Sequence, residues 1–138
     1  MMEGEKFEFD STTENASYEL ESFFSYNGII YRKVGGEYQF LFSSRGCKWK
    51  TVCRVHRRVV LIYGIYPFQA TNSERADMAC GEVNRRLLHG AMFRENDTLV
   101  FRTDADIGDG WGAYDVILQA MEYNASVMTA FWQRFSLC

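Results

Sequence analysis

The segment WGAYDVILQAMEYNASVMTAFWQRF, residues 111–135, decides the fold class, because its apolar side chains recur every three or four residues. This spacing places them along one face of a helix. The side chains that share the face are Tyr114, Ile117, Leu118, Met121, Ala125, Met128, Phe131, Trp132 and Phe135. The sequence therefore predicts a long amphipathic helix that closes the chain over other elements.

Segments earlier in the chain alternate instead, as strands do. In EYQFLFSS, residues 37–44, the aromatic side chains fall on one side and mostly polar ones on the other, and CKWKTVCRVH, residues 47–56, repeats the pattern. Such alternation is typical of a sheet with one covered face and one wetter face. Residues 29–34 predict a further strand, joined to the next by a Gly35-Gly36 turn. Residues 58–66 form either a separate strand or a continuation of the third.

The remaining segments complete the order of elements. Residues 11–26 predict a helix after a loose lead-in over residues 1–10, and a capping box of Thr71 and Glu74 begins a helix that ends at Gly90. Two strands flank the turn at Asn96-Asp97. The prediction is a single α+β domain over residues 1–138, an α-β-β-β-α-β-β-α sandwich with helices packed on an antiparallel sheet.

Composition excludes several classes of protein. The 138 residues are 47% hydrophobic and carry a net charge of −3, so the chain folds around a core and lacks the basic excess of a nucleic-acid binder. Its apolar runs are shorter than a membrane helix requires, and its start does not resemble a signal peptide. We therefore expect a cytoplasmic protein with no membrane or nucleic-acid partner. Its four cysteines, without metal-ligand spacing, are expected to be free thiols.

The acidic segment TDADIGDGWGAYD, residues 103–115, is a candidate cation site through Asp104, Asp106 and Asp109. A calcium loop requires glycine at its sixth position and glutamate at its twelfth, and this segment has aspartate at both. We therefore predict no metal and assign Asp109 to capping the following helix. Binding of a divalent cation or small ligand at the Asp104–Asp109 turn remains the alternative function.

No arrangement in the sequence indicates catalysis. His56 and His89 have no partners at a suggestive spacing, and the glycines do not form a phosphate-binding loop. We predict no enzyme activity, no catalytic residues, no cofactor and no small-molecule ligand. Arg54, Arg57 and Arg58 leave RNA binding as a weaker alternative.

The helices carry more apolar surface than one copy is expected to cover, which indicates a protein partner, either a client or a second copy. The end of the last helix is the clearest case, because little chain remains to bury it. The candidate binding surface comprises Tyr38, Phe40, Phe42, Trp49, Phe131, Trp132 and Phe135. The first four of these also fit core positions. A client would add as an extended segment to a sheet edge or lie in a helix groove.

Residues 72–135 resemble the YbjN-like family, also called bacterial sensory-transduction regulators. The resemblance is carried by EVNRRLLHGAMF at 82–93, by NDTLVFRTDADI at 96–107 and by the long closing helix. It implies an α-β-β-β-α-β-β-α fold like that of type III secretion chaperones, commonly homodimeric and without catalytic residues. The expected function is thus a non-enzymatic protein-binding module, chaperone- or regulator-like and homodimeric.

Overall fold

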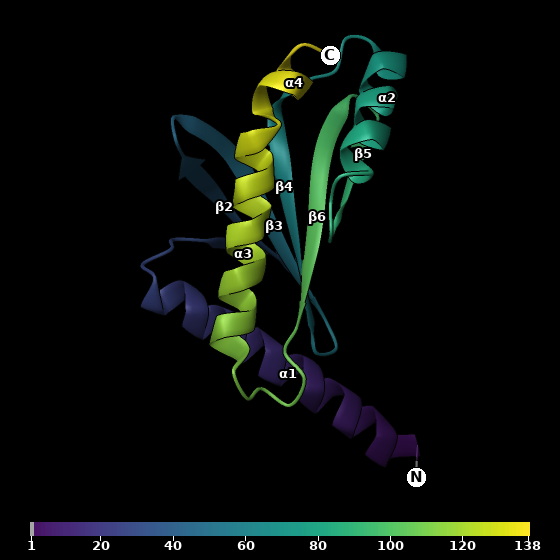
Figure 1. The fold of residues 1–138 in the computed structure, drawn as a ribbon. Coiled ribbons are helices and arrows are strands. Elements are labelled where there is room, and N and C mark those ends of the chain that lie inside the picture. The colour runs from purple at the N-terminus through teal and green to yellow at the C-terminus, as the bar shows by residue number, and fades with distance from the viewer. Residues whose placement is uncertain (1) are drawn as a thin grey trace.

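The computed structural model describes the backbone of residues 2–138 and the side chains of residues 13–138 (Figure 1). In chain order its elements are α1 (Met2–Tyr26), β1 (Arg32–Val34), β2 (Glu37–Ser44), β3 (Cys47–His56), β4 (Val59–Gln69), α2 (Ser73–Asn84), β5 (Ala91–Glu95), β6 (Thr98–Asp106), α3 (Ala113–Ala130) and α4 (Trp132–Ser136). The predicted α+β class and the order of helices and sheet are confirmed.

The strands form a six-stranded antiparallel sheet in the order β1-β2-β3-β4-β6-β5. Tight turns join β1 to β2, β2 to β3, β3 to β4 and β5 to β6, and each places a residue in the left-handed region, as Gly35 (φ 61°) and Asn96 (φ 55°) do. The question left open for residues 58–66 is settled, because β4 is a strand of its own after a turn in which Arg57 has φ 57°. β4 also continues past Pro67, where its register with β6 is irregular.

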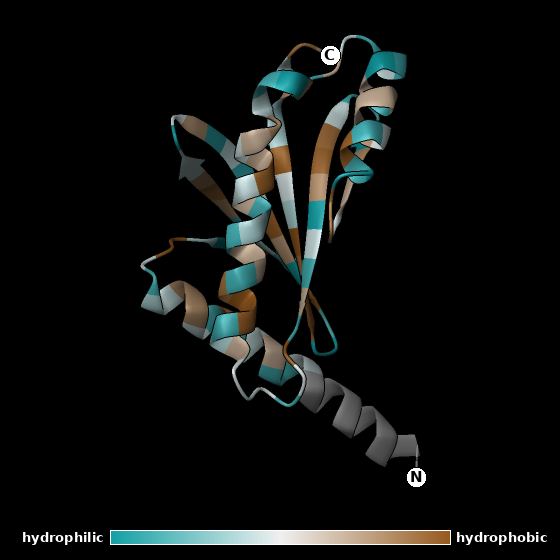
Figure 2. Cartoon of the chain, in the orientation of Figure 1, coloured by the Kyte–Doolittle hydropathy of each residue, from teal (hydrophilic) through white to brown (hydrophobic). Residues whose placement is uncertain are grey.

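All the helices cover the same face of the sheet. α3 lies along the sheet, α1 crosses near one end of it, and α2 lies beside β5 (Figure 1). Two clusters of buried side chains fill the space between the layers, one under α2, α3 and α4 and one between α1, α3 and the sheet. Along most of β4 and β6 buried residues alternate with more exposed ones, and the inward residues are the buried ones. Apolar residues are seen in the strands and in the facing helix α3 (Figure 2).

A buried amide fixes α3 to the centre of the sheet. Asn124 Nδ2 donates to the carbonyl oxygens of Ile62 (3.3 Å) and Phe101 (3.2 Å) and to Thr103 Oγ1 (3.2 Å). Beneath it, β4 has a glycine because a Cβ at Gly64 would lie 2.7 Å from Asn124 Oδ1. The polar contact thus sets how α3 lies along the strands.

The predicted bounds need correction at three elements. α1 begins at Met2 and not at Ser11, so its backbone includes residues 2–10, where the sequence predicts a loose lead-in. β1 is confined to Arg32–Val34, shorter than the strand predicted over residues 29–34. The closing helix is broken at Phe131 (φ −106°, ψ 10°), since Trp132 and Phe135 turn inward onto Tyr66.

α2 also differs from its predicted form at both ends. Its N-cap is Asn72, whose side chain accepts from Arg75 N–H, while Thr71 Oγ1 donates to the last carbonyl of the chain. The helix ends at Asn84 and not at Gly90, because the Asn84 side chain turns back to hydrogen-bond β5. Gly90 (φ 80°) lies in the following loop, where a Cβ would approach the neighbouring strand at 2.6 Å.

Candidate protein-binding site

One stretch of β2 lies at an uncovered edge of the sheet. β1 pairs with β2 from Glu37 to Gln39, so the rest of β2, residues 40–44, has no strand on that side among the described residues. An exposed edge of this kind can pair with an added strand. The shortness of β1 therefore creates the candidate site.

The two hairpins around β2 determine which backbone groups point to the open edge. In a two-residue hairpin the residues that flank the turn exchange backbone hydrogen bonds, and the pattern alternates from there. The Ser44↔Cys47 pair then directs the even-numbered residues of β2 toward β3, and the Val34↔Glu37 pair directs the odd-numbered ones toward β1. Beyond the end of β1, the N–H and C=O groups of Leu41 and Ser43 point outward to solvent.

An apolar groove runs along this edge. Its walls are the loop after α1 and the end of β2, and the residues that line it are Gly28, Ile29, Ile30, Phe40, Leu41, Phe42 and Ser43. Two of its apolar side chains are strongly exposed, Ile30 at 92% and Leu41 at 68%. The groove therefore offers main-chain pairing groups and apolar side chains in one place.

Contacts with α1 anchor both walls of the groove. Ile29 N–H donates to Phe24 O at 2.9 Å, which fixes the loop immediately after the helix. Tyr38 Oη donates to a Glu21 carboxylate oxygen at 2.5 Å, and Lys33 Nζ lies 3.4 Å from the same oxygen. Burial, followed by the hydrogen bond to Glu21, raises the pKa of Tyr38, so its hydroxyl remains a donor. These contacts thus anchor β1 and the loop before it to α1.

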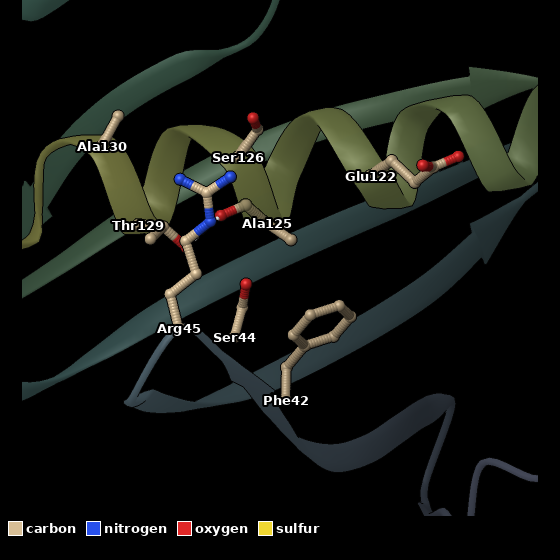
Figure 3. Close-up of a pocket in the computed structure, with 8 residues that line it drawn as sticks. All are labelled: Phe42, Ser44, Arg45, Glu122, Ala125, Ser126, Thr129 and Ala130. Carbon is tan, nitrogen blue, oxygen red and sulfur yellow. Dashed lines mark hydrogen bonds between the residues drawn. The ribbon is translucent and has the colours of Figure 1, made fainter.

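A second hollow lies on the helix side of the same strand end (Figure 3). Arg45 and Ser44 rise from the β2–β3 turn toward the hydroxyl-bearing side chains of α3, and Phe42 belongs to both hollows. The lining residues are Phe42, Ser44, Arg45, Glu122, Ala125, Ser126, Thr129 and Ala130. This hollow carries one cation, one anion and hydroxyl groups, which can select polar side chains of a bound segment.

A side chain of α2 covers the middle of the opposite edge of the sheet. Asn84 Nδ2 donates to Met92 O and Asn84 Oδ1 accepts from Met92 N–H, both at 2.8 Å, so the side chain occupies the outward backbone groups of Met92 in β5. Arg94 adds a two-bond pair to Asp77 of α2, at 2.8 and 2.9 Å. By contrast, the end of β2 leaves the outward backbone groups of both Leu41 and Ser43 without a strand partner in the described part of the chain.

The residues predicted to form the binding surface lie mostly in the core. Tyr38, Trp49 and Phe135 are each 1% exposed and Phe40 is 7% exposed. Phe42, Phe131 and Trp132 are half-buried against the larger core cluster. The end of the closing helix is covered because α4 folds back onto β4, which the periodicity of one straight helix does not reveal. Of the seven residues, Phe40 and Phe42 line the edge groove.

Sequence reasoning missed Ile30 and Leu41. A signal for Leu41 was present, since it is an apolar residue between Gln39 and Ser43 on the side of the strand predicted to be wet. The sequence predicts a strand that includes Ile30. The strand begins only at Arg32, so Ile30 lies in the preceding loop and lines the groove.

The aspartate turn is organised by local hydrogen bonds. Asp106 Oδ1 accepts from Gly108 N–H at 2.9 Å and lies 3.2 Å from Arg58 Nε. Asp109 Oδ1 accepts from Trp111 N–H at 3.0 Å, whereas the predicted cap of α3 by Asp109 is wrong, because the N-cap is Gly112. Among residues 13–138, no group of three or more His, Cys, Asp or Glu side chains is placed to hold a metal ion.

The thiols are free, as predicted, among the described residues. Burial raises the pKa of Cys53 to about 12 and, with the nearby Asp77 charge, that of Cys80 to about 11. Both thiols are therefore protonated near neutral pH and poor nucleophiles.

Comparisons with known proteins identify the fold. No family model matches the chain, and no curated protein matches it. Among solved structures, the chain is similar to the crystal structure of YbjN, a proposed transcription regulator from E. coli, with a TM-score of 0.57 and 10% identity over 83% of this chain and 90% of that one. The chain thus has the YbjN fold. No helix in the described part of the chain is long and apolar enough to cross a membrane.

Proposed function

We propose that this chain is a non-enzymatic, regulator- or chaperone-like module that binds a partner protein by adding an extended segment of it to the edge of β2. The observation that carries the proposal is the pair of outward backbone groups at Leu41 and Ser43 beside an exposed apolar groove. The similarity to a proposed regulator supports the same class of function. We further propose that the protein acts in the cytoplasm as a homodimer.

Main-chain pairing would supply the affinity of the site. Two residues with outward N–H and C=O groups can form up to about four hydrogen bonds, each contributing about 0.5–1.5 kcal/mol net. Apolar side chains of the partner would cover Ile30 and Leu41, which are strongly exposed in the free protein. Alternate side chains of the segment would face the hollow around Phe42, where Arg45 and Glu122 can discriminate among them.

A proline substitution tests whether the backbone carries the binding. A peptide selected on the protein from a random phage-displayed library is measured by isothermal titration against wild type, Leu41→Pro and Leu41→Thr. Proline removes the outward N–H of residue 41 while the bonds of β2 to β3 remain, and threonine keeps that N–H. We expect proline to weaken binding by at least about tenfold, and threonine to stay within about threefold of wild type.

Circular dichroism and thermal melting show whether both variants remain folded. Equal binding by all three proteins would reject the edge as the site. An equal loss with threonine and proline would show that the Leu41 side chain, and not strand addition, provides the affinity.

A further inference from the structure

The second face of the sheet is not covered by any described helix residue. The inward side chains make up both core clusters, and the outward ones appear in neither. The outward face nevertheless carries apolar side chains on every strand from β2 to β6, namely Leu41, Val52, Val59, Leu61, Tyr63, Ile65, Phe93 and Val100. Leu41 is strongly exposed, Val52 and Val100 are buried between their neighbours, and the others are half-buried. Half-buried apolar side chains on a sheet face that no helix covers, with charged side chains around them, are typical of an interaction surface.

The charges on this face are divided by strand. β3 presents basic side chains outward, namely Lys48, Lys50 and Arg54, and His56 lies at the end of the same row. β6 presents Arg102, Asp104 and Asp106. Between them, β4 is apolar along its outward side from Val59 to Ile65. The face thus has an apolar centre with a basic flank and, toward one end, an acidic flank.

We propose that this face binds a second copy of the chain, with a two-fold axis parallel to β4 and between the two sheets. A twisted sheet is saddle-shaped, and a two-fold rotation about its central strand maps the saddle onto itself. Two copies can therefore lie face to face with aligned strands, as in a β-sandwich. The contact is isologous, so each favourable pair occurs twice.

The strand register determines which residues meet. Arg54, Leu61 and Asp104 lie in one row across β3, β4 and β6. Rotation about β4 exchanges the two flanking strands without shifting the row, so Arg54 faces Asp104 of the second copy. The next row pairs His56 with Asp106 in the same way. The other axis in the sheet plane, perpendicular to the strands, would place β3 against β3 and oppose basic side chains.

Contacts within one copy are compatible with this pairing. Arg54 forms a salt bridge with Glu37 and lies over the Tyr63 ring at 5.4 Å, which holds the guanidinium on the outward face. A guanidinium has five N–H donors, so Arg54 can bridge Glu37 and an aspartate of the second copy.

The face is also large enough. Each outward residue of a sheet covers about 33 Å², from about 4.8 Å between strands and about 6.8 Å along two residues. The outward face of β2 to β6 therefore offers on the order of 700 Å², close to the roughly 800 Å² that each partner contributes to a standard interface. The inference deepens and rests on the homodimeric part of the proposed function, and it leaves the edge of β2 open in both copies.

Charge reversal and exchange test the geometry. Sedimentation velocity over a concentration series compares wild type with Arg54→Asp, Asp104→Arg and the double variant. Each single reversal opposes like charges twice in the dimer, so we expect its dissociation constant to rise by at least about tenfold. The double variant restores opposite charges and should return to within about threefold of wild type. Glu74→Arg, on the helix side, is the control and should leave the dimer unchanged.

Two results would overturn the inference. One is a wild-type protein that stays monomeric at all concentrations. The other is a dimer that does not depend on these charges as described: either the single reversals do not weaken it, as in a dimer formed edge to edge through β2, or the double variant does not restore it. The peptide titration distinguishes failure of the dimer from failure of the strand-addition site. Leu41-dependent peptide binding by a monomeric protein would refute the dimer alone. A dimer without peptide binding would refute the strand-addition site alone.

Discussion

Asn84 is the residue whose removal most directly tests how the structure closes one edge of its sheet. Its side-chain amide takes both outward backbone groups of Met92, each at 2.8 Å. Asn84→Ala removes both hydrogen bonds and leaves the strand with an N–H and a C=O facing solvent. At about 0.5–1.5 kcal/mol for each bond, the loss is about 1–3 kcal/mol, and the better helix propensity of alanine offsets a few tenths of this.

We therefore expect Asn84→Ala to lower the free energy of unfolding by about 1–2.5 kcal/mol. Urea denaturation monitored by tryptophan fluorescence measures the change, and Arg85→Ala, at the next position and exposed, is the matched control. The newly open edge should also increase self-association at high protein concentration, which light scattering detects. A variant within about 0.5 kcal/mol of wild type and equally monodisperse would refute the role of Asn84 in closing this edge.

Three further predictions concern the core, the thiols and acid stability. Gly64→Val should destabilise the fold by more than about 2 kcal/mol, measured by urea denaturation, because its Cβ alone would meet α3 side chains at 2.7 Å. In the folded protein, iodoacetamide should label the half-exposed Cys47 before the buried Cys53, whose pKa is about 12, and mass spectrometry of timed samples shows the order. The hydrogen bond with Arg94 lowers the pKa of Asp77. The Asp77–Arg94 pair therefore stabilises the fold at pH values above the ordinary pKa of an aspartate, and this stabilisation is lost as the pH falls through the lowered pKa. Asp77→Asn should therefore destabilise the protein at pH 7 more than at pH 2, as thermal melts at both pH values would show.

Much of the fold could be predicted from local sequence, because strand alternation and helix periodicity are strong in this chain. The turns at Gly35-Gly36 and Asn96-Asp97 use residue types that favour positive φ, and both were predicted correctly. The turn that separates β3 from β4 is formed by arginines, with Arg57 at φ 57°. Arginine carries no such preference, so the independence of β4 could not be recognised.

The site was harder to predict because it depends on the missing pairing partner of β2 beyond Gln39. The predicted binding surface includes Phe40 and Phe42 because they are aromatic. Tyr38 and Trp49 are aromatic as well, yet they are buried in the core, so aromatic character does not distinguish the two cases. The groove exists because β1 begins only at Arg32, a limit set by contacts between the preceding loop and α1 and not by local propensity. The predicted excess of apolar surface was located on the helices, where Tyr18, Tyr26 and Met78 are exposed. The structure adds exposed apolar side chains at the edge of β2, namely Ile30 and Leu41.

Amide hydrogen exchange over residues 40–44, followed by NMR, is the measurement that tests the central claim most directly. In the free protein, Phe40 and Phe42 amides should exchange slowly because they pair with β3, while those of Leu41 and Ser43 exchange fast. A bound peptide should make the Leu41 and Ser43 amides slow as well. Slow exchange at both residues in the free protein, or fast exchange that persists in the complex, would contradict strand addition at this edge.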